Sequence, residues 1–374
     1  MDLAYTIEQD MLAESIQRFI ATEYDLSNRK ALVASDLGYS AQHWQTFAQL
    51  GWLGMSIPES YGGLGGDLVD TMIMFEEFGK ALVLEPTLSS LVLFAGALEL
   101  AGSDAQKHQH LPALGTGDLT GCLAYVESDA PTNFNQVSTT AVQAEDQYRL
   151  NGTKSVVLNA ASADFIIVSA RTDGQDDDPQ GISLFLVPSN TEGLSRKDYP
   201  TVDGLRASEV TLDNVLIPAS ARLGAEGTAS QTLNAVINRG ILAISAEAVG
   251  AMEALYQSTI DYTKQREQFD HPLSEFQVVK HRLTEMFIEY NLAKSLCMKA
   301  TMLLNQHSED AQRHIHALKF LIGKTSRFVG QNAVQLHGGM GMTEDLAIAH
   351  YFKRLMMIDA TFGHTDIHLE AFVQ

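Results

Sequence analysis

Apolar residues before the glycine-rich turn at 338–341 recur at helical spacing. Six positions that would share one helix face are Ile315, Leu318, Ile322, Thr325, Val329 and Leu336. The glycines can end this helix because glycine adopts positive φ without steric cost. Thr343 would cap the next helix, and Glu344 and Asp345 suit its first turn. The pattern alone predicts two helices joined at a corner, since a lone glycine-rich turn is weak evidence for a phosphate site.

The period of the apolar pattern changes twice along the chain. Up to about residue 114 it is helical, with a first face at Ile7, Met11 and Ile16, and a glycine-rich loop at 62–66 interrupts it. Near Gly117 it becomes strand-like. Seven short runs follow, at 122–126, 141–143, 148–150, 155–158, 165–169, 182–187 and 210–215. Turn signals such as Asn151-Gly152 separate them, and such a series indicates an antiparallel barrel or sandwich.

From about residue 230 the pattern returns to long helices. One face runs from Ile244 to Tyr262, and this helix ends near Arg266. Three or four such helices would form an up-and-down bundle. We therefore expect an α+β multidomain protein. Its parts would be an N-terminal helical domain at 1–117, a middle antiparallel β-barrel or sandwich at 118–227 and a C-terminal up-and-down four-helix bundle at 228–374.

Composition and charge exclude several classes of function. The chain has 374 residues, of which 45% are hydrophobic, and no apolar run approaches the length of a membrane span. A formal charge of −21 opposes binding to nucleic acids or anionic membranes. Cys122 and Cys297 form no metal-binding or disulfide motif, and no G-x-G-x-x-G follows a strand, so neither a metal site nor a nicotinamide cofactor is expected. The N-terminus lacks the pattern of a signal peptide, which favours the cytoplasm.

Three motifs in the C-terminal helices carry a family resemblance. They are Arg266-Glu267-Gln268-Phe269, Phe276-Gln277 and the turn Gln335-Leu336-His337-Gly338-Gly339. With Gly51-Trp52-Leu53-Gly54, Phe75-Glu76-Glu77-Phe78-Gly79 and Gly204-Leu205-Arg206-Ala207-Ser208, they resemble the acyl-CoA dehydrogenases over nearly the whole chain.

The resemblance implies FAD as the cofactor, bound across a dimer interface. Arg266 would pair with the pyrophosphate of the neighbour's FAD, and Phe269 and Gln277 would lie on the adenine side. Gln335, Gly338 and Gly339 would allow close approach of the backbone.

Acyl-CoA dehydrogenases remove the α proton of a thioester while a hydride leaves the β-carbon for flavin N5, which gives a trans-2-enoyl-CoA. The usual base is a Glu followed by Gly in the C-terminal domain. Counting on from Gln335 places this position at Phe362-Gly363, where no side chain accepts a proton. A second family position, near Asn238-Arg239-Gly240, also lacks a carboxylate.

Two other residues are candidates for the base. Glu247 lies in an apolar helix segment that could raise its pKa, but it could equally be a structural group bonded to a neighbouring helix. His364 follows the Phe-Gly pair, and it could equally be a packed or solvated histidine.

The middle domain departs from the family pattern where the flavin ring would lie. Val126-Glu127-Ser128-Asp129 replaces the usual Thr-Glu-Pro-Gly, and Val156-Val157-Leu158 replaces Trp-Ile-Thr or Trp-Ile-Ser. A Val offers no aromatic face and a Leu donates no hydrogen bond. The residues expected around the flavin ring are therefore altered. The residues expected to bind the adenosine and pyrophosphate of a neighbouring subunit's FAD are retained.

These departures resemble the small subunits of heteromeric acyl-CoA dehydrogenases that act on pimeloyl-CoA or steroid side-chain CoA substrates. The leading hypothesis is a partner subunit that donates the adenosine and pyrophosphate half of an FAD site to a second dehydrogenase chain. The alternatives are a self-sufficient homodimer or homotetramer with a relocated base and a non-catalytic structural subunit. The resemblance also implies an acyl-CoA substrate and an electron-transfer flavoprotein as the acceptor.

Overall fold

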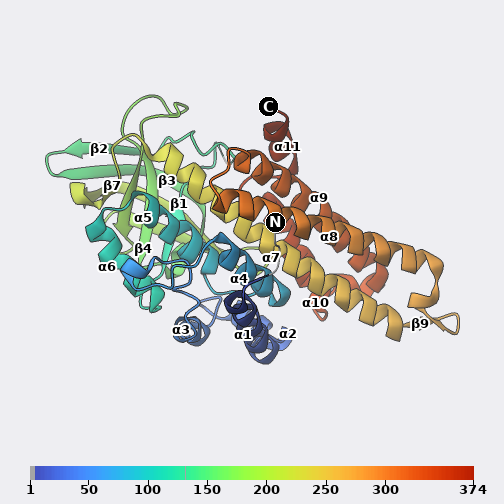
Figure 1. The fold of residues 1–374 in the computed structure, drawn as a ribbon. Coiled ribbons are helices and arrows are strands. Elements are labelled where there is room, and N and C mark those ends of the chain that lie inside the picture. Colours follow the sequence, from blue (N-terminus) through green and yellow to red (C-terminus); the bar gives the residue numbers. More distant parts are fainter. Residues whose placement is uncertain (1–4, 131) are drawn as a thin grey trace. The chain divides into compact units, whose positions relative to one another are not determined.

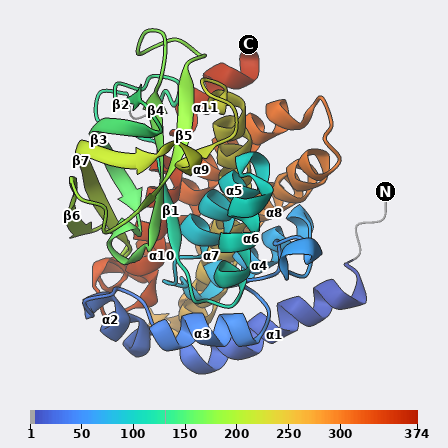
Figure 2. The ribbon, with the colours of Figure 1, turned by 90° about the vertical axis from the view of Figure 1, so that its left-hand side faces the viewer.

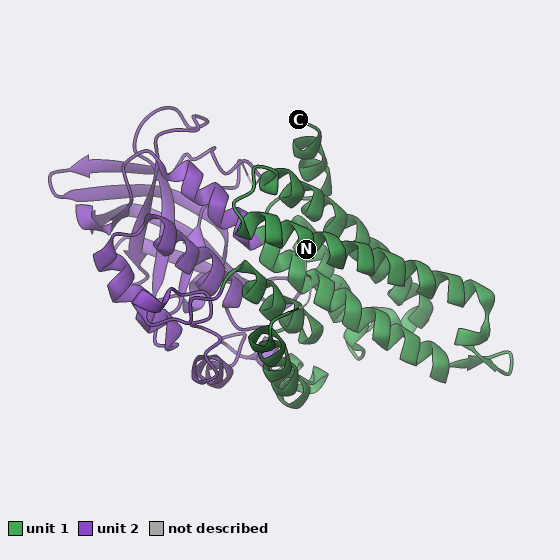
Figure 3. Cartoon of the chain, viewed as in Figure 1, with its two compact units in different colours: residues 1–31, 67–83, 241–374 green, residues 32–66, 84–240 purple. Residues whose placement is uncertain are grey.

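The computed structural model describes residues 5–130 and 132–374, and the chain divides into two units (Figure 3). The helical unit takes the chain up to residue 31, then 67–83 and 241–374, and the sheet unit takes 32–66 and 84–240. The long helix α7 (Ala229–Gln265) begins in the sheet unit and ends in the helical unit. The expected domain boundaries at 117/118 and 227/228 follow the order of elements along the chain and stay a prediction.

The sheet unit contains eight strands in one sheet (Figure 2). The strands are β1 (Gly121–Ala124), β2 (Thr140–Ala144), β3 (Gln147–Leu158), β4 (Phe165–Arg171), β5 (Ile182–Pro188), β6 (Leu194–Pro200), β7 (Arg206–Pro218) and β8 (Arg222–Leu223). Their order is β6-β7-β3-β2-β4-β5-β8, with β1 paired to β4. The sheet is mainly antiparallel, as predicted, although β4 runs parallel to β1 and, at one residue pair, to β2.

One turn signal was misread in the sequence. Asn151-Gly152 predicts a hairpin, but it lies inside the single long strand β3, which joins the runs predicted at 148–150 and 155–158. Gly152 has φ 148° where the register of β3 against β7 shifts, so it forms a bulge. The hairpin between β2 and β3 instead turns near Glu145, whose φ is 56°.

Strand β6 was not predicted from the sequence. Its residues from Ser195 to Asp198 are polar and exposed, so they lack the apolar alternation of a half-buried strand. The predicted runs at β4 and β5 are almost continuously buried. The strands enclose an apolar core. In it, the ring centroids of Tyr148 and Phe185 lie 4.9 Å apart.

Four helical segments of the sheet unit precede β1 in the chain, besides the short 3-10 helix η1 (Glu59–Tyr61). They are α3 (Ala41–Gln49), the π-helical segment η2 (Leu88–Phe94), α5 (Ala95–Ala101) and α6 (Asp104–Gly115). The η2 segment contacts β1 directly, and a Cβ at Gly121 would collide with the ring of Phe94. A glycine therefore permits the close contact between this segment and the sheet.

Seven helices besides α7 lie wholly or largely in the helical unit (Figure 1). They are α1 (Ile7–Glu23), α2 (Leu26–Ala34), α4 (Leu68–Ala81), α8 (Gln277–Asn305), α9 (Ala311–His337), α10 (Ala347–Ala360) and α11 (Thr365–Val373). Helix α9 packs against α8, α10 and α11, and α4 packs against α1 and α8. The predicted long helices that end near Arg266 and before the glycine turn are confirmed as α7 and α9.

Two details of the helix predictions were wrong. In α1, Ile16 is buried as predicted, but Ile7 and Met11 are 76% and 63% exposed, and Leu12 is buried in their place. Thr343 does not cap the next helix, because α10 begins at Ala347 after Leu346. The glycine turn continues as a short 3-10 helix, η6 (Gly338–Met342), and the Thr343 hydroxyl donates to the Met340 carbonyl within it.

Helix α7 is the one described helix that is long and apolar enough to cross a membrane by length and composition. Most of its apolar window, 83%, is buried inside the protein, as expected for a core helix. Its middle part packs very closely against α4. A Cβ at Gly79 would collide with the Glu247 carbonyl, and a Cβ at Gly250 would collide with the Glu76 carbonyl.

We expect Gly250→Ala to force α4 and α7 apart and to lower the free energy of unfolding by about 1–3 kcal/mol, as overpacked cores do. Urea unfolding followed by circular dichroism measures this change. Gly96→Ala in α5 is the control, because a Cβ there meets its nearest atom at an ordinary 3.7 Å. Equal stability of the two variants would contradict the close-contact interpretation.

Candidate functional site

The residues predicted to bind the cofactor's adenosine and pyrophosphate lie at one end of the helical unit. Helix α7 stops at Gln265, the small hairpin of β9 (Glu267–Gln268) and β10 (His271–Pro272) follows, and α8 starts at Gln277 (Figure 1). The Tyr262 ring stacks on the His337 imidazole with centroids 4.2 Å apart, which fixes the end of α7 against the end of α9. Arg266 follows Tyr262 by one helical turn, and Gly338 follows His337 directly.

This end of the unit presents polar and aromatic groups to solvent. Arg266 is exposed, and within residues 5–130 and 132–374 its guanidinium has no hydrogen bond or ion pair. The Phe269 ring is 86% exposed at a residue with φ 55°, and Gln277 and Gln335 are exposed as well. Exposed aromatic side chains in strained turns are frequent at binding surfaces.

The glycines beside these side chains leave open space. Gly338 has φ 62°, which favours glycine, and a Cβ at Gly338 or Gly339 would meet no atom within 4 Å. A guanidinium, a phenyl ring, two amides and an uncovered backbone fit the pyrophosphate and adenosine of FAD. The structure therefore brings together all six predicted cofactor residues: Arg266, Phe269, Gln277, Gln335, Gly338 and Gly339.

The predicted position of the usual base lies in the turn between α10 and α11. Phe362 is buried and has φ 62°, and Gly363 has φ 96°. The phenyl ring cannot accept a proton, so this turn carries no general base at Phe362. His364 follows as the N-cap residue of α11, and its side chain is exposed.

Glu247 is engaged in a buried ion pair. Its two carboxylate oxygens accept hydrogen bonds from Nε and Nη2 of Arg354 on α10, both at 2.6 Å. Both residues are buried, and removing one partner would leave an isolated charge in the interior. This geometry favours the structural interpretation of Glu247, and its role as a base stays a prediction.

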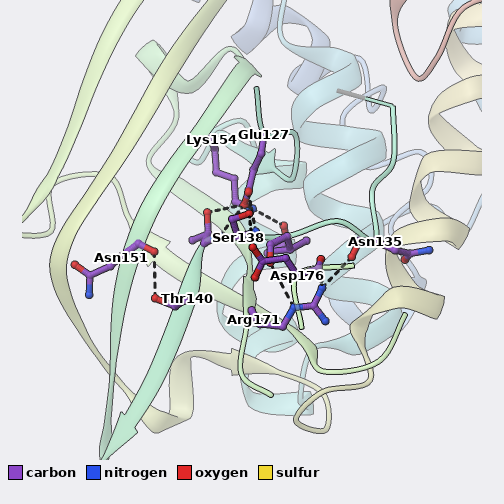
Figure 4. Close-up of polar contacts among 11 residues, drawn as sticks. Glu127, Asn135, Ser138, Thr140, Asn151, Lys154, Arg171 and Asp176 are labelled. Atoms are coloured by element: carbon purple, nitrogen blue, oxygen red, sulfur yellow. Dashed lines mark hydrogen bonds and ion pairs between the residues drawn. The ribbon is translucent and has the colours of Figure 1, made fainter. Parts of the chain in front are cut away.

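The two altered segments expected near the flavin ring lie side by side in the sheet unit (Figure 4). The Ser155 amide donates to the Val126 carbonyl at 2.8 Å, which joins the segment 126–129 to the segment 155–158. Beneath them, Lys154 Nζ donates to Glu127 Oε1 at 2.7 Å and to Ser169 Oγ at 3.0 Å.

Glu127 has a complete set of donors besides Lys154. Its Oε1 accepts from the hydroxyl and amide of Thr139, and its Oε2 accepts from the Ser138 amide at 2.8 Å. Burial acts to raise the pKa of Glu127, but Lys154 and these donors outweigh it and hold the pKa below its usual value. Burial lowers the pKa of Lys154 to about 8, although Glu127 opposes the shift. The ion pair fixes both segments in place.

Val156 has an unusual backbone conformation. It is β-branched, yet its φ is 52°, and it lies where the register of β3 against β7 shifts between Lys154 and Val157. Its side chain is 46% exposed. The bulge therefore presents a small aliphatic group, and neither Val156 nor Leu158 supplies an aromatic face or a side-chain donor.

Arg171 is a central residue that the sequence did not identify. Its guanidinium donates to five backbone carbonyls, those of Asn135, Val137, Asp176, Asp178 and Gln180. It therefore fixes two loops beside a cavity of about 790 Å³ (Figure 4). The cavity lining includes Asp173 and Glu226 but no Lys or Arg. A lone Arg at the end of an apolar strand gave no signal in the sequence.

Three family models match the chain in order. They are "Acyl-CoA dehydrogenase, N-terminal domain" at residues 6–118, "Acyl-CoA dehydrogenase, middle domain" at 122–215 and "Acyl-CoA dehydrogenase, C-terminal domain" at 229–374. Among curated proteins, the chain is 29% identical over 372 residues to the probable acyl-CoA dehydrogenase YngJ of Bacillus subtilis (strain 168), covering 98% of this chain and 97% of YngJ. It is 30% identical over 325 residues to the 3-(aryl)acrylate reductase of Clostridium sporogenes (strain ATCC 15579), with 86% of each covered.

Solved structures match along the full chain. A variant of the steroid ACAD Tcur3481-Tcur3483 has a TM-score of 0.88 at 27% identity, covering 98% of this chain and 96% of that one. The FAD complex of PigA has a TM-score of 0.92 at 27% identity, covering 100% and 98%. The ChsE4-ChsE5 complex from Mycobacterium tuberculosis has a TM-score of 0.91 at 23% identity over 100% and 98%, and this likeness shows the fold alone.

These findings confirm the expected fold class of helical N-terminal, middle β and helical C-terminal parts. They also agree with FAD as the expected cofactor, since PigA is described as an FAD complex. The chain belongs to the acyl-CoA dehydrogenase family of flavoprotein oxidoreductases.

Proposed function

We propose that this chain is the partner subunit of a heteromeric acyl-CoA dehydrogenase. It would donate the adenosine and pyrophosphate half of an FAD site, and a second, related chain would supply the flavin-ring half and the base. The reaction is the α,β-dehydrogenation of an acyl-CoA thioester to a trans-2-enoyl-CoA. The observation that carries the proposal is the contrast between an open set of cofactor residues around Arg266 and a buried Phe362 at the position of the base.

In this proposal each retained residue has a role toward the cofactor. FAD supplies the hydride acceptor when bound. Arg266 would neutralise pyrophosphate charge with charge-assisted hydrogen bonds, and Phe269 would cover the adenine face. The uncovered backbone at Gly338 and Gly339 would let the cofactor approach closely.

Exposed apolar side chains at the same end and along α8 support a bound second chain. We name them the partner face. The partner face consists of Phe269, Val278, Phe287, Ile288, Leu292, Met340 and Met342, each at least 48% exposed. Phe269, Met340 and Met342 lie in the turns that carry the cofactor residues, and exposed apolar groups are frequent at protein–protein interfaces. The occupant we propose is the related dehydrogenase chain.

The finer assignments follow from the family resemblance. We propose an electron-transfer flavoprotein as the electron acceptor, the cytoplasm as the location and a division into domains 1–117, 118–227 and 228–374. A steroid or fatty acyl chain is proposed as the substrate class, and the steroid ACAD described for Tcur3481-Tcur3483 supports the former.

A self-sufficient homomeric enzyme is the second candidate. The specific observation in its favour is the exposed His364 next to Phe362, because an exposed imidazole is accessible to a substrate. Glu247 is a poorer base, because Arg354 binds both of its oxygens. A purely structural subunit would have no need for the retained cofactor residues.

We expect the chain purified alone to lack flavin. Co-expression with the related dehydrogenase chain should give a complex with one FAD for each pair of chains, because each half-site alone is incomplete. Flavin absorbance with protein quantification measures this ratio. A stable homo-oligomer with one FAD per chain and full activity would overturn the proposal.

We expect Arg266→Gln in the complex to weaken FAD binding by about 10- to 100-fold, since a hydrogen bond to a charged group contributes about 1.5–3 kcal/mol. Lys264→Gln is the matched control, because it removes an equally exposed positive charge from the same helix end. Equilibrium dialysis of FAD against the apo-complex distinguishes them. Equal affinities of the two variants would show that Arg266 does not touch the cofactor.

We expect His364→Gln to leave turnover of the complex unchanged, because the base lies on the other chain. Loss of a general base lowers turnover by about 10²–10⁴-fold. Steady-state dehydrogenation with an artificial electron acceptor measures the difference. A loss of that size with flavin content retained would favour the self-sufficient enzyme with His364 as its base.

A further inference from the structure

The turn between α10 and α11 is fixed by side chains of α9 and α11. At the end of α10, the carbonyls of Asp359 and Gly363 both accept hydrogen bonds from Lys319 Nζ at 2.8 Å. The Phe362 carbonyl accepts from His368 Nε2 at 2.9 Å. Carbonyls at a helix end lack partners within the helix, so these buried donors satisfy groups that would otherwise be unpaired.

The carboxylate of Asp359 closes the same turn. Its Oδ1 accepts from the Thr365 hydroxyl at 2.7 Å, and its Oδ2 accepts from Arg327 Nη2 at 3.1 Å. A Cβ at Gly323 of α9 would collide with both Asp359 and Thr365, so this glycine leaves room for the pair. The turn therefore touches α9 through several independent contacts, and His368 of α11 bonds the Phe362 carbonyl.

His368 is bonded to a second histidine. Its Nδ1 lies 3.0 Å from Nδ1 of His316, and the rings are 5.2 Å apart. Because the Phe362 carbonyl can only accept, His368 Nε2 carries the proton, and in the neutral ring Nδ1 is then an acceptor. His316 must therefore donate from its Nδ1, which leaves its Nε2 free to accept from the Gln312 amide at 2.9 Å. One neutral tautomer assignment satisfies every contact of the histidine pair, His316 and His368.

We propose that His368 is a positioning residue that, with His316, fixes the Phe362-Gly363-His364 turn of this chain. The turn carries both the family position of the base and the alternative candidate His364, and the inference rests on the proposed function only for this assignment. Phe362 and Gly363 both have positive φ, and such a backbone persists only where its surroundings hold it. Gly363 also leaves room for the His368 ring beside the Phe362 carbonyl, since a Cβ at residue 363 would lie 3.2 Å from His368 Nε2.

Protonation of both rings breaks the pair, since two Nδ1–H groups cannot bond to each other. Burial lowers the pKa of His368 to about 4, the Phe362 carbonyl opposes this, and the positive charges of Lys319, His316 and His364 add to it. Burial also lowers the pKa of His316. Other charged groups near the turn include Asp359 and Arg327, which are paired to each other, Asp366 in the first turn of α11, and Arg313, which lies over the Phe372 ring.

The direction of the pH dependence follows from the lowered pKa. An opened turn would titrate its histidine near the ordinary 6.5, whereas the closed turn keeps His368 neutral down to about 4. The contact is therefore complete above pH 6.5 and weakens as the pH falls toward 4. Over this range the opening equilibrium should increase by up to about tenfold per pH unit for the single proton of His368.

The test is amide hydrogen exchange of the isolated chain, with protection factors corrected for intrinsic rates. The reporters are the amides of Thr365, bonded to Asp359, and Ile367, bonded to His364. His368→Leu should lower their protection on the order of tenfold at pH 7, since it removes the bond to Phe362. His368→Gln keeps a donor and an acceptor, so it should retain protection at pH 7 but lose the dependence between pH 6.5 and 4. His314→Gln on α9 is the control and should behave as the unmodified chain.

Unchanged protection and pH dependence in His368→Leu would overturn the inference. A complex without flavin would refute the proposed function, whereas the exchange data decide the role of the histidine pair separately.

Discussion

Each unit of this protein depends on one buried ammonium group. Lys154 in the sheet unit and Lys319 in the helical unit are both fully buried, and burial lowers the pKa of each to about 8. An ammonium in the interior is tolerated only when oxygens surround it. Glu127 and Ser169 accept hydrogen bonds from Lys154, and the carbonyls of Asp359 and Gly363 accept them from Lys319. Both lysines therefore fix backbone segments that the family uses at its active site.

The two segments fixed in this way are the ones that depart from the family pattern in sequence. The Glu127 loop remains joined to the bulge at Val156, although that bulge offers no ring or donor to a flavin. The turn after α10 has positive φ at Phe362 and Gly363, and a phenyl ring lies at the position predicted for the base. In contrast, the surroundings of Arg266 are open and chemically suited to a dinucleotide. This contrast fits the proposed assembly, in which two chains together form one FAD site.

The sequence predicted elements with strong periodicity and missed those set by partners far along the chain. The faces of α7 and α9 and the apolar strands β4 and β5 were recognisable because burial repeats along them. Strand β6 is polar, and Asn151-Gly152 forms a bulge rather than a turn, so local signals misled there. For the site, the residues that the motifs predict to bind the cofactor lie together at one end of the bundle, and their role stays a prediction. No local pattern could show that Glu247 pairs with Arg354, which is 107 residues away. Nor could it show that Arg171 donates hydrogen bonds to five backbone carbonyls.

The ends of the strand order have a consequence for how the protein associates. One edge of the sheet is β6, with exposed charged side chains at Arg196, Lys197 and Asp198, and the other is β8, with only two residues. Charged or very short edge strands resist pairing with strands of another molecule. Extension of the sheet is therefore disfavoured at both of these edges. Exposed apolar side chains of the helical unit, such as Ile288 and Leu292, are better suited to specific association than these strand edges.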